Sequence, residues 1–517
     1  MLRAAGPLML SVILVAACAT EPTATPPAVS SAAPSPAATP EPATTPPTPA
    51  STTAPTPTPS PPPSPTPGPV ADGWPVTLLA DGWATAVVGA KGTTYAWADG
   101  PGHRRVLVAL DTAGRMKPGW PFAPPRLTVD QPLVVAADGS LLVGLSDDGD
   151  AGYELHRLGA DGHELPGWPF RDDGASYCEP PVADPDGTTY LGCVREADEA
   201  LEVIAIDRAG RVVRGWPVPP GDGEGFGSDV QVGTDGTIYA LTVRNDGEGL
   251  ARLWAFAADG SPRPGWPVTL GSHGAGFIVA PQGRILVSSY IPPEVPAEGL
   301  CSEARETVLA ELDTGGRMVA GWPRTAAGWA SEPVVAADGT VYYLTSERVF
   351  ARAPDGTVRP GWPVAIPPVY PNCGSYGPFL APDGTVHVMA NGLRAFGPDG
   401  RLKPGWPYRP ASGFAGPACV TDAVDTTIPV IGPDGTVYVA TRVPGGDPDR
   451  SGLLEVVALD RAGRVAAGWP YRLPVAERGQ VGLEVAGGRL YVTLTSCGQS
   501  GSGTSILAID PDGTPSD

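Results

Sequence analysis

Short apolar runs, rich in β-branched and aromatic residues and separated by glycine turns, recur along most of this chain. In the run 334–344, valines and tyrosines flank Asp338-Gly339, which is typical of two strands joined by a tight turn. The run 201–207 alternates imperfectly and is apolar enough to be buried on both faces between stacked sheets. Helical periodicity is absent outside the first residues, so the pattern predicts an all-β protein.

The tripeptide Gly-Trp-Pro punctuates these runs nine times, and a turn glycine lies five residues before eight of the copies. Another turn glycine opens an apolar run in each unit. Each unit therefore predicts four short antiparallel strands, A to D, with tight A–B and C–D turns and variable B–C and D–A connections, which is the blade of a β-propeller. The tripeptide glycines are Gly73, Gly119, Gly167, Gly215, Gly265, Gly321, Gly361, Gly405 and Gly468.

The ends of the repeat array predict how the ring closes. The copy at Gly73 lacks strands A to C before it, and the last unit, ending in 505–517, lacks its own Gly-Trp-Pro. We expect the N-terminal strand to complete the last blade, giving one closed propeller over residues 70–517. This count gives nine blades, above the usual range of about 4 to 8, and eight is the alternative count.

The repeated tryptophan is expected at the end of strand D, where it packs on the neighbouring blade. Glycine before it permits a bend, and proline after it suits an edge strand that needs no further donor. An identical residue in every repeat is what stacking of blades requires, so stacking is favoured over ligand binding.

Two segments carry a family resemblance. Residues 109–114 (Ala-Leu-Asp-Thr-Ala-Gly) and 458–463 (Ala-Leu-Asp-Arg-Ala-Gly), each followed by a tryptophan, resemble the docking repeat of quinoprotein-like, or PQQ-like, β-propellers. The resemblance implies the propeller fold and covers roughly residues 70–517. That family places its tryptophan three residues after the glycine, whereas here it lies six after. Its quinone-dependent dehydrogenases usually carry adjacent cysteines, which this chain lacks, so no cofactor is predicted.

Two N-terminal segments are expected not to fold with the propeller. Residues 1–17 contain Arg3 and an apolar run, 8–15, too short for a comfortable membrane span and typical of a secretory signal peptide. Residues 15–18 (Val-Ala-Ala-Cys) resemble a bacterial lipobox, in which Cys18 becomes the lipidated first residue. Residues 19–69 contain 47 Pro, Ala, Thr or Ser among 51 residues and predict an extended, disordered linker.

The charge of the chain limits its partners. The net charge is −21 and no basic stripe is found, so nucleic acids and anionic lipid surfaces would repel the protein. We expect an extracytoplasmic protein that is anchored to the bacterial cell membrane through the lipid on Cys18.

Six further cysteines fit an oxidising exterior. The turn at Asp186-Gly187 puts Cys178 and Cys193 nearly opposite each other on strands A and B, which predicts a disulfide. Cys373 and Cys419 precede strand A in consecutive blades and form a plausible second pair. The remaining two, Cys301 and Cys497, lie in B–C loops of blades four apart, and their pairing stays open.

The variable connections all leave one face, and function on repeat scaffolds concentrates in such loops. Ten residues before the A–B turn glycine, four successive blades carry an aromatic or histidine, and three of these blades carry an acid two or three residues later. They predict a ring at the mouth of the central channel, either as aromatic packing with solvated acids, which is favoured, or as a polar-aromatic ligand site. Its members are Tyr177, Phe226, His273, Trp329, Glu179, Asp229 and Glu332.

Signs of catalysis are weak. The five histidines show no metal-ligand spacing, so no metal site is predicted and each histidine is expected on the surface or in a loop. The acidic segments 146–150 and 446–449 match no twelve-residue calcium loop and are interpreted as solvated turns. The sequence favours a binding or scaffold module, without catalytic residues, for a protein, glycan or small ligand. The alternative is a divergent quinoprotein-like oxidoreductase or a hydrolase that uses acids at the channel mouth.

Overall fold

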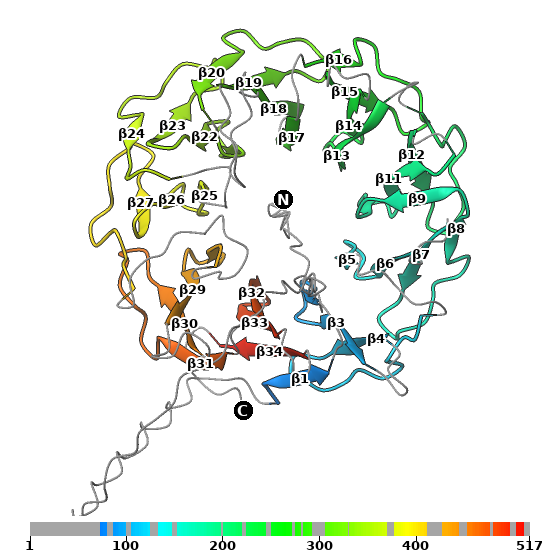
Figure 1. The fold of residues 1–517 in the computed structure, drawn as a ribbon, viewed down its shortest axis with the longest axis horizontal. Coiled ribbons are helices and arrows are strands. Elements are labelled where there is room, and N and C mark those ends of the chain that lie inside the picture. Colours follow the sequence, from blue (N-terminus) through cyan, green and yellow to red (C-terminus); the bar gives the residue numbers. More distant parts are fainter. Residues whose placement is uncertain are drawn as a thin grey trace, which may run out of the picture. The chain divides into compact units, whose positions relative to one another are not determined.

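A computed structural model shows the chain as an all-β ring of nine antiparallel blades around a central channel (Figure 1). All described residues lie in one compact unit, Pro67–Asp517. The structure describes residues 73–79, 86–99, 105–124, 133–146, 152–197, 200–219, 224–244, 250–270, 275–280, 283–291, 306–328, 330–369, 377–410, 427–443, 452–475, 479–496 and 503–510.

Each blade places its first strand beside the channel and its last at the rim (Figure 1). The innermost strands A are β2 (Ala86–Val88), β5 (Val134–Val135), β9 (Ala175–Cys178) with β10 (Val182–Ala183), β13 (Glu224–Val232), β17 (Ala275–Ala280), β21 (Val334–Val335), β25 (Phe379–Leu380), β28 (Val430–Ile431) and β32 (Gly479–Ala486). Strands B are β3 (Thr94–Asp99), β6 (Leu141–Ser146), β11 (Thr189–Arg195), β14 (Ile238–Arg244), β18 (Arg284–Ile291), β22 (Val341–Leu344), β26 (Val386–Met389), β29 (Val437–Val443) and β33 (Arg489–Ser496).

The outer half of each blade follows the same order. Strands C are β4 (Arg105–Leu110), β7 (Tyr153–Leu158), β12 (Leu201–Ile206), β15 (Ala251–Phe256), β19 (Glu306–Leu312), β23 (Arg348–Arg352), β27 (Leu393–Phe396), β30 (Gly452–Leu459) and β34 (Gly503–Ile509). Strands D are β8 (Phe170–Asp172), β16 (Val268–Thr269), β20 (Arg324–Ala327), β24 (Val364–Ala365), β31 (Tyr471–Val475) and β1 (Val76–Leu79). In blades one, three and seven, strand D is reduced to isolated bridges, at Leu107–Phe122, Val203–Val218 and Leu393–Tyr408.

The ring closes as the sequence predicted. The ninth blade has the order β1-β34-β33-β32, so the first strand of the propeller is the outer strand of the last blade. Val76 pairs with Ile506 and Leu79 with Gly503. Nine blades are therefore confirmed, and the alternative of eight is wrong.

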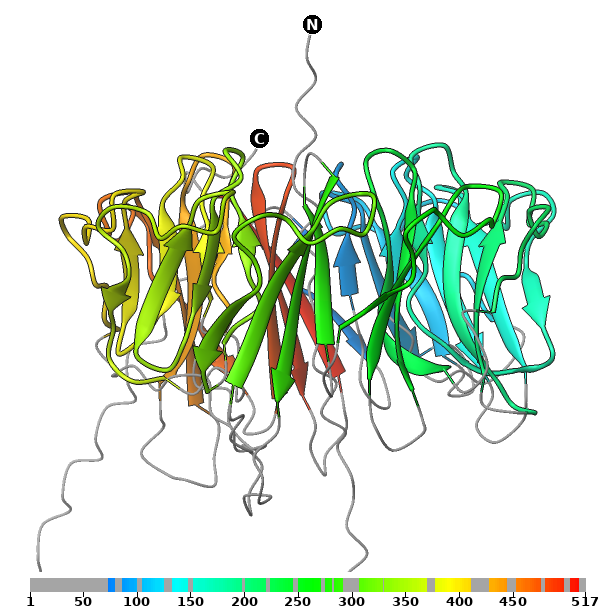
Figure 2. The same ribbon diagram turned by 90° about the horizontal axis from the view of Figure 1, so that it is seen from above.

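The two faces of the disc differ in what they carry. Because the strands alternate in direction, the A–B and C–D turns lie on one face, here called the turn face, and these turns line one edge of the disc in Figure 2. The B–C and D–A connections leave the opposite face, here called the loop face. The variable loops expected from the sequence thus share one face.

Each repeated tryptophan connects its blade to the next one. Seven indole nitrogens donate to a backbone carbonyl in the C–D turn of the following blade at 3.0–3.4 Å, as in Trp216 to Ala258 and Trp74 to Thr112. Packing on the neighbouring blade is therefore confirmed. The tryptophans precede strand D instead of ending it, because the outer strand starts to pair only at the residue after the proline, as at Phe170 in β8.

In eight of the nine repeats, the glycine before the tryptophan makes this contact fit. Gly215 has a φ of +96°, and a Cβ there would lie 2.0 Å from the carbonyl oxygen of Asp259 in the next blade. The tryptophans are 6–8% exposed and pack in apolar clusters that span two blades. In one such cluster, the Trp216 ring lies edge-on to Tyr190 at 5.8 Å between ring centres. The Gly-Trp-Pro repeat thus marks the seam between blades.

Candidate functional site

The loop face of blade three holds a disulfide between neighbouring strands. Cys178 of β9 is paired in register with Cys193 of β11, and their sulfurs are bonded at 2.04 Å. Both cysteines are fully buried. The predicted disulfide is confirmed, and it ties the inner strand of the blade to its neighbour where the loops emerge. The other predicted pair, Cys373 with Cys419, and also Cys301 and Cys497, lie outside the described residues.

Two members of the predicted mouth ring flank this disulfide. Tyr177 pairs with Val194 and its side chain is 45% exposed, which is unusual for an aromatic residue in a strand. Glu179 is half-buried, and its backbone nitrogen donates to the carbonyl of Gly192 at 2.9 Å. The two residues therefore have backbones fixed by strand pairing while their side chains reach the surface.

An ion pair, which sequence reasoning missed, supports the same end of the blade. Nη1 of Arg195 on β11 lies 2.8 Å from both carboxylate oxygens of Asp172 on β8, and 3.6 Å from Glu202. Gly174 makes room for the guanidinium, because a Cβ there would lie 2.2 Å from its Nη2 atom. Asp172 belongs to the outer strand of blade two, so the ion pair connects blades two and three beside Tyr177. In the sequence, the only sign of this contact is the glycine of the tight Asp173-Gly174 turn, which leaves space for a neighbouring side chain.

The strand register separates two of the predicted ring members. Cys193 and Thr242 hold the same repeat position, six residues after the A–B turn glycine. Cys193 pairs with Cys178, whereas Thr242 pairs with Phe226. Phe226 thus corresponds to Cys178 and not to Tyr177, because β13 contains bulges that change the residue count. In a strand, a shift of one residue turns the side chain to the opposite face.

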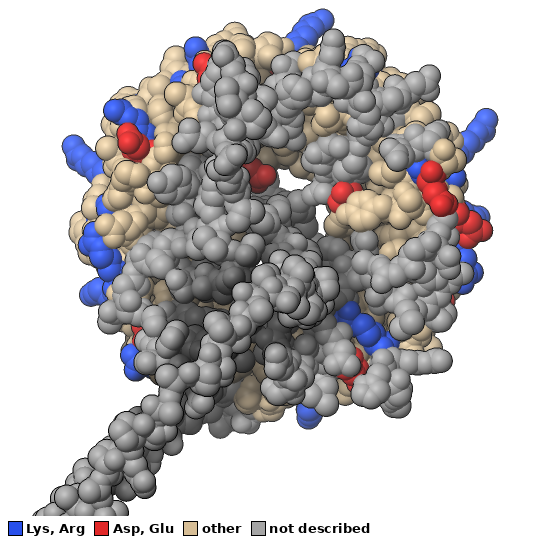
Figure 3. Space-filling model, viewed as in Figure 1, with Lys and Arg blue, Asp and Glu red and all other residues tan. Residues whose placement is uncertain are grey.

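The remaining ring members are placed in part. Glu332 is exposed, and a Cβ added to Gly276 of blade five would lie 3.8 Å from its Oε1 atom. Asp229 lies in β13, and only its backbone is described. His273 and Trp329 lie outside the described residues. Figure 3 shows acidic side chains beside the central opening. The ring as a ligand site stays a prediction.

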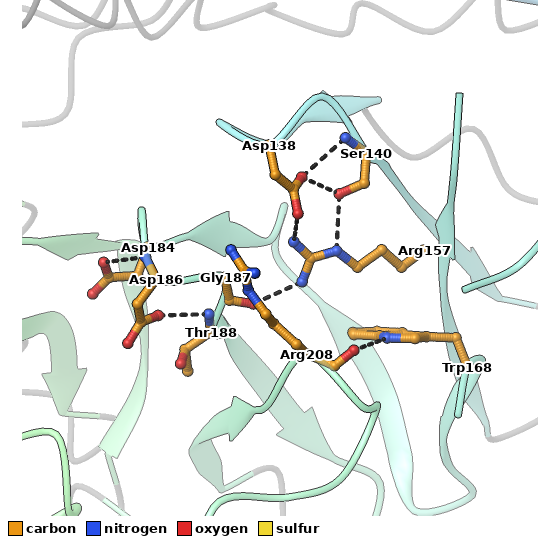
Figure 4. Close-up of polar contacts among 9 residues, drawn as sticks. All are labelled: Asp138, Ser140, Arg157, Trp168, Asp184, Asp186, Gly187, Thr188 and Arg208. Atoms are coloured by element: carbon orange, nitrogen blue, oxygen red, sulfur yellow. Dashed lines mark hydrogen bonds and ion pairs between the residues drawn. The ribbon is translucent and has the colours of Figure 1, made fainter. Parts of the chain in front are cut away.

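On the turn face, a buried arginine joins blades two and three (Figure 4). Arg157 is 1% exposed, and its Nε donates to Ser140 Oγ at 2.9 Å. Its Nη1 donates to the Gly187 carbonyl of the next blade at 2.7 Å, and its Nη2 to Asp138 at 3.0 Å. Burial alone would raise the pKa of Asp138, but hydrogen bonds from Ser140 and the charge of Arg157 outweigh it and lower this pKa. All three arms of the guanidinium are thus used within the seam.

Two histidines contradict the expectation that all five lie at the surface. His156 is 1% exposed and lies between two carboxylates, with Nδ1 2.5 Å from Glu164 and Nε2 3.2 Å from Glu154. His387 is 3% exposed, and burial together with the nearby charge of Lys403 lowers its pKa to about 4. Both histidines lie on strands B or C, His156 on β7 and His387 on β26, and neighbouring aromatic rings cover them. They are therefore buried, whereas a histidine in a loop would be exposed.

The described ranges contain neither a metal-binding cluster nor a membrane-spanning helix. No group of three or more His, Cys, Asp or Glu side chains there could hold a metal ion. None of the described residues forms a helix long and apolar enough to cross a membrane. Of the acidic segment 146–150 only Ser146 is described, and the segment 446–449 lies outside those ranges.

Comparisons with known proteins assign no family to this chain. No protein family matches the sequence, including the PQQ-like repeat that it resembles, and no curated protein matches it. Among solved structures, 237 chains are similar. A eukaryotic initiation factor is 13% identical, with a TM-score of 0.48, and the match covers 82% of this chain and 94% of that one.

Two further neighbours bind or cleave carbohydrates by name. The BP39L lectin from Burkholderia pseudomallei is 14% identical with a TM-score of 0.36, covering 75% of this chain and 97% of that one. A PL25 ulvan lyase is 10% identical with a TM-score of 0.37, covering 84% and 96%. The structural neighbours are β-propeller proteins.

Proposed function

We propose that this protein is a binding module that contacts a protein or glycan partner through its loop face. The observation that carries the proposal is the contrast between the faces. On the turn face, glycines, indoles and the buried guanidinium of Arg157 are used to join blades. On the loop face, blade three presents the half-exposed Tyr177 from a strand that the Cys178–Cys193 disulfide holds in place.

The chemistry of this patch suits a ligand with both an apolar face and hydrogen-bonding groups. Tyr177 offers an aromatic surface, and Glu179 offers carboxylate oxygens two residues away. The Asp172–Arg195 ion pair borders them. An aromatic platform beside a few polar groups on a rigid frame is a common composition for recognition sites.

A pair of matched variants tests the proposal. Tyr177→Ala should weaken binding on a glycan array or to a captured protein partner by about 1 to 2 kcal/mol, which is roughly a 5- to 30-fold loss of affinity. Met116→Ala is the control, because Met116 is equally exposed at 46% but lies in a C–D turn on the opposite face. Equal binding by the two variants would exclude the loop-face patch, and thermal unfolding of both would detect a loss of stability.

We further propose that lipid on Cys18 anchors the protein to the outside of the bacterial cell membrane, with residues 19–69 as the spacer. This proposal rests on the sequence alone, in which the lipobox-like residues 15–18 follow the apolar run 8–15 and precede the linker. Cys18→Ala removes the thiol that would accept the acyl group. The variant should lose palmitate labelling and leave the membrane fraction, and unchanged labelling would contradict the anchor.

A further inference from the structure

The innermost strands of a propeller have one edge without a partner strand. In β2 of blade one, the nitrogen of Gly89 donates to Thr93 within the A–B turn at 2.8 Å. Successive N–H groups of a strand point to opposite sides, so the nitrogen of Val88 points away from β3. Such an unpaired donor needs another acceptor.

A carboxyl group from the last blade supplies that acceptor. Glu484 of β32 crosses the seam between blades nine and one, and its Oε2 accepts a hydrogen bond from the nitrogen of Val88 at 3.0 Å. This seam is the one where the N-terminal strand β1 completes the ring. The contact is called the closing contact below.

The seam between blades four and five has a glutamine at the same repeat position. Gln231 pairs with Tyr239 of β14, as Glu484 pairs with Tyr491 of β33, and both tyrosines lie three residues after the A–B turn glycine. Gln231 makes two bonds to β17. Its Oε1 accepts from the nitrogen of Val279 at 3.0 Å, and its Nε2 donates to the carbonyl of Phe277 at 2.8 Å.

The repeat aligns the two seams residue by residue. Val279 and Val88 both lie four residues before their turn glycine, and Phe277 corresponds to Ala86. An amide can donate and accept at once, whereas a carboxylate can only accept. A protonated carboxyl group, like the amide, can donate one hydrogen bond and accept another at the same time.

We propose that Glu484 works as a protonated counterpart of Gln231, accepting from Val88 and donating its proton to the carbonyl of Ala86, so that deprotonation weakens the closing contact. The closing seam then holds a pH-dependent bond where the equivalent seam holds a permanent one. Loss of the proton to solvent leaves a carboxylate that retains the bond from Val88 and faces the Ala86 carbonyl without a donor.

The surroundings of Glu484 favour its neutral form. Burial raises the pKa of Glu484 to about 7, although the hydrogen bond from Val88 opposes this. The nearby titratable groups are Tyr491, whose pKa burial also raises, and the Arg489–Asp510 ion pair, in which Arg489 is the first residue of β33 and lies two residues from Tyr491. That arginine is committed to Asp510 at 2.6 Å and to the carbonyl of Thr112.

A reciprocal exchange in the full-length protein tests the proposal. Hydrogen exchange is measured between pH 5 and 9 on peptides that cover β2 and β17, and expressed as protection relative to the unfolded chain. In the wild type, protection of β2 should fall by up to about tenfold per pH unit as the pH rises from about 5 towards the folded-state pKa of about 7, and should level off above it, because the opened state with its ordinary carboxyl pKa binds up to one proton fewer. Glu484→Gln should make protection of β2 independent of pH.

The converse variant, Gln231→Glu, should give β17 the pH dependence that β2 has in the wild type. A pH dependence of β2 that persists in Glu484→Gln would overturn the proposal, as would a Gln231→Glu variant in which β17 stays insensitive. If Gln231→Glu does not fold, the result for Glu484→Gln still decides. A purely structural role for Glu484 would change protection at all pH values equally, which also contradicts the proposal.

Discussion

Two glycine-to-alanine substitutions separate the close approach between blades from backbone strain. Gly215, in a Gly-Trp-Pro seam, and Gly236, in an A–B turn of the following blade, both have positive φ angles, of +96° and +75°. A Cβ at Gly236 would meet nothing within 4 Å, whereas one at Gly215 would lie 2.0 Å from the oxygen of Asp259. Both alanine variants carry the cost of a positive φ angle, and only Gly215→Ala adds a steric collision with the next blade.

The magnitudes follow from this geometry. A left-handed conformation costs an alanine about 1 to 2 kcal/mol, so Gly236→Ala should lose about that much stability. In Gly215→Ala, the next C–D turn must move by more than 1 Å to restore an ordinary contact, estimated from packing distances of about 3.5 Å. That shift would break the Trp216–Ala258 hydrogen bond and loosen a tryptophan that is 6% exposed. We expect an additional loss of about 2 to 4 kcal/mol.

Equilibrium urea unfolding, followed by tryptophan fluorescence, measures both variants. Gly215→Ala should shift the midpoint well below that of Gly236→Ala, with similar slopes. If the two free energies of unfolding agree within about 0.5 kcal/mol, the usual margin for comparing independent sites, then the glycines of the seam serve only their φ angle. The close approach of Gly215 to the next C–D turn would then not contribute to the docking of the blades.

Three further predictions concern other parts of the ring. Asp138→Asn should destabilise the fold by about 3 kcal/mol because it leaves the buried Arg157 charge unpaired. Asp434→Asn, at the same turn position, should cost under about 1 kcal/mol, because the neighbouring Arg461 is exposed and bonds the backbone carbonyl of Asp434 instead of its carboxylate; urea unfolding compares the two variants. The folded-state pKa of His387, about 4, is lower than usual, so its contribution to stability is complete above about pH 6.5 and is lost as the pH falls through 4. His387→Tyr, which restores the residue common at this repeat position, should therefore raise the melting temperature more at pH 5 than at pH 8, and an equal gain would contradict this. Deleting residues 70–76 should destabilise the domain by roughly several kcal/mol, because blade nine loses part of its outer strand, and an unchanged melting temperature would show that the ring does not depend on that strand.

The architecture could be predicted because the same pattern of turn glycines and Gly-Trp-Pro occurs in nine repeats. Turn glycines at fixed distances define strands A to D, and the incomplete units at Gly73 and at 505–517 reveal how the ring closes. The place of the tryptophan relative to strand D could not be read, because strand bounds depend on hydrogen bonds that no residue type specifies. The burial of His156 was missed for a related reason, since a charged or polar residue gives no sign of which neighbour will cover it.

The candidate site was predictable only where register is regular. Cys178 and Cys193 were found because the Asp186-Gly187 turn fixes their alignment. Counting ten residues back from a turn failed to align Tyr177 with Phe226, because bulges in β13 insert residues that the count cannot see. Contacts between blades, such as Arg195 with Asp172, join residues from different repeats, and only the folded ring brings them together.

The pairing of β1 with β34 determines the order in which the blades can assemble during synthesis of the chain. As the polypeptide is synthesised from its N-terminal end, each blade can dock on the one before it as soon as its C–D turn is complete. The seam between blades nine and one has to wait, because β34 ends at Ile509, 430 residues after β1 ends at Leu79. Until then the nascent protein is an open arc with an unpaired strand at one end. A chaperone that shields β1 during this interval would protect the arc from joining a second molecule.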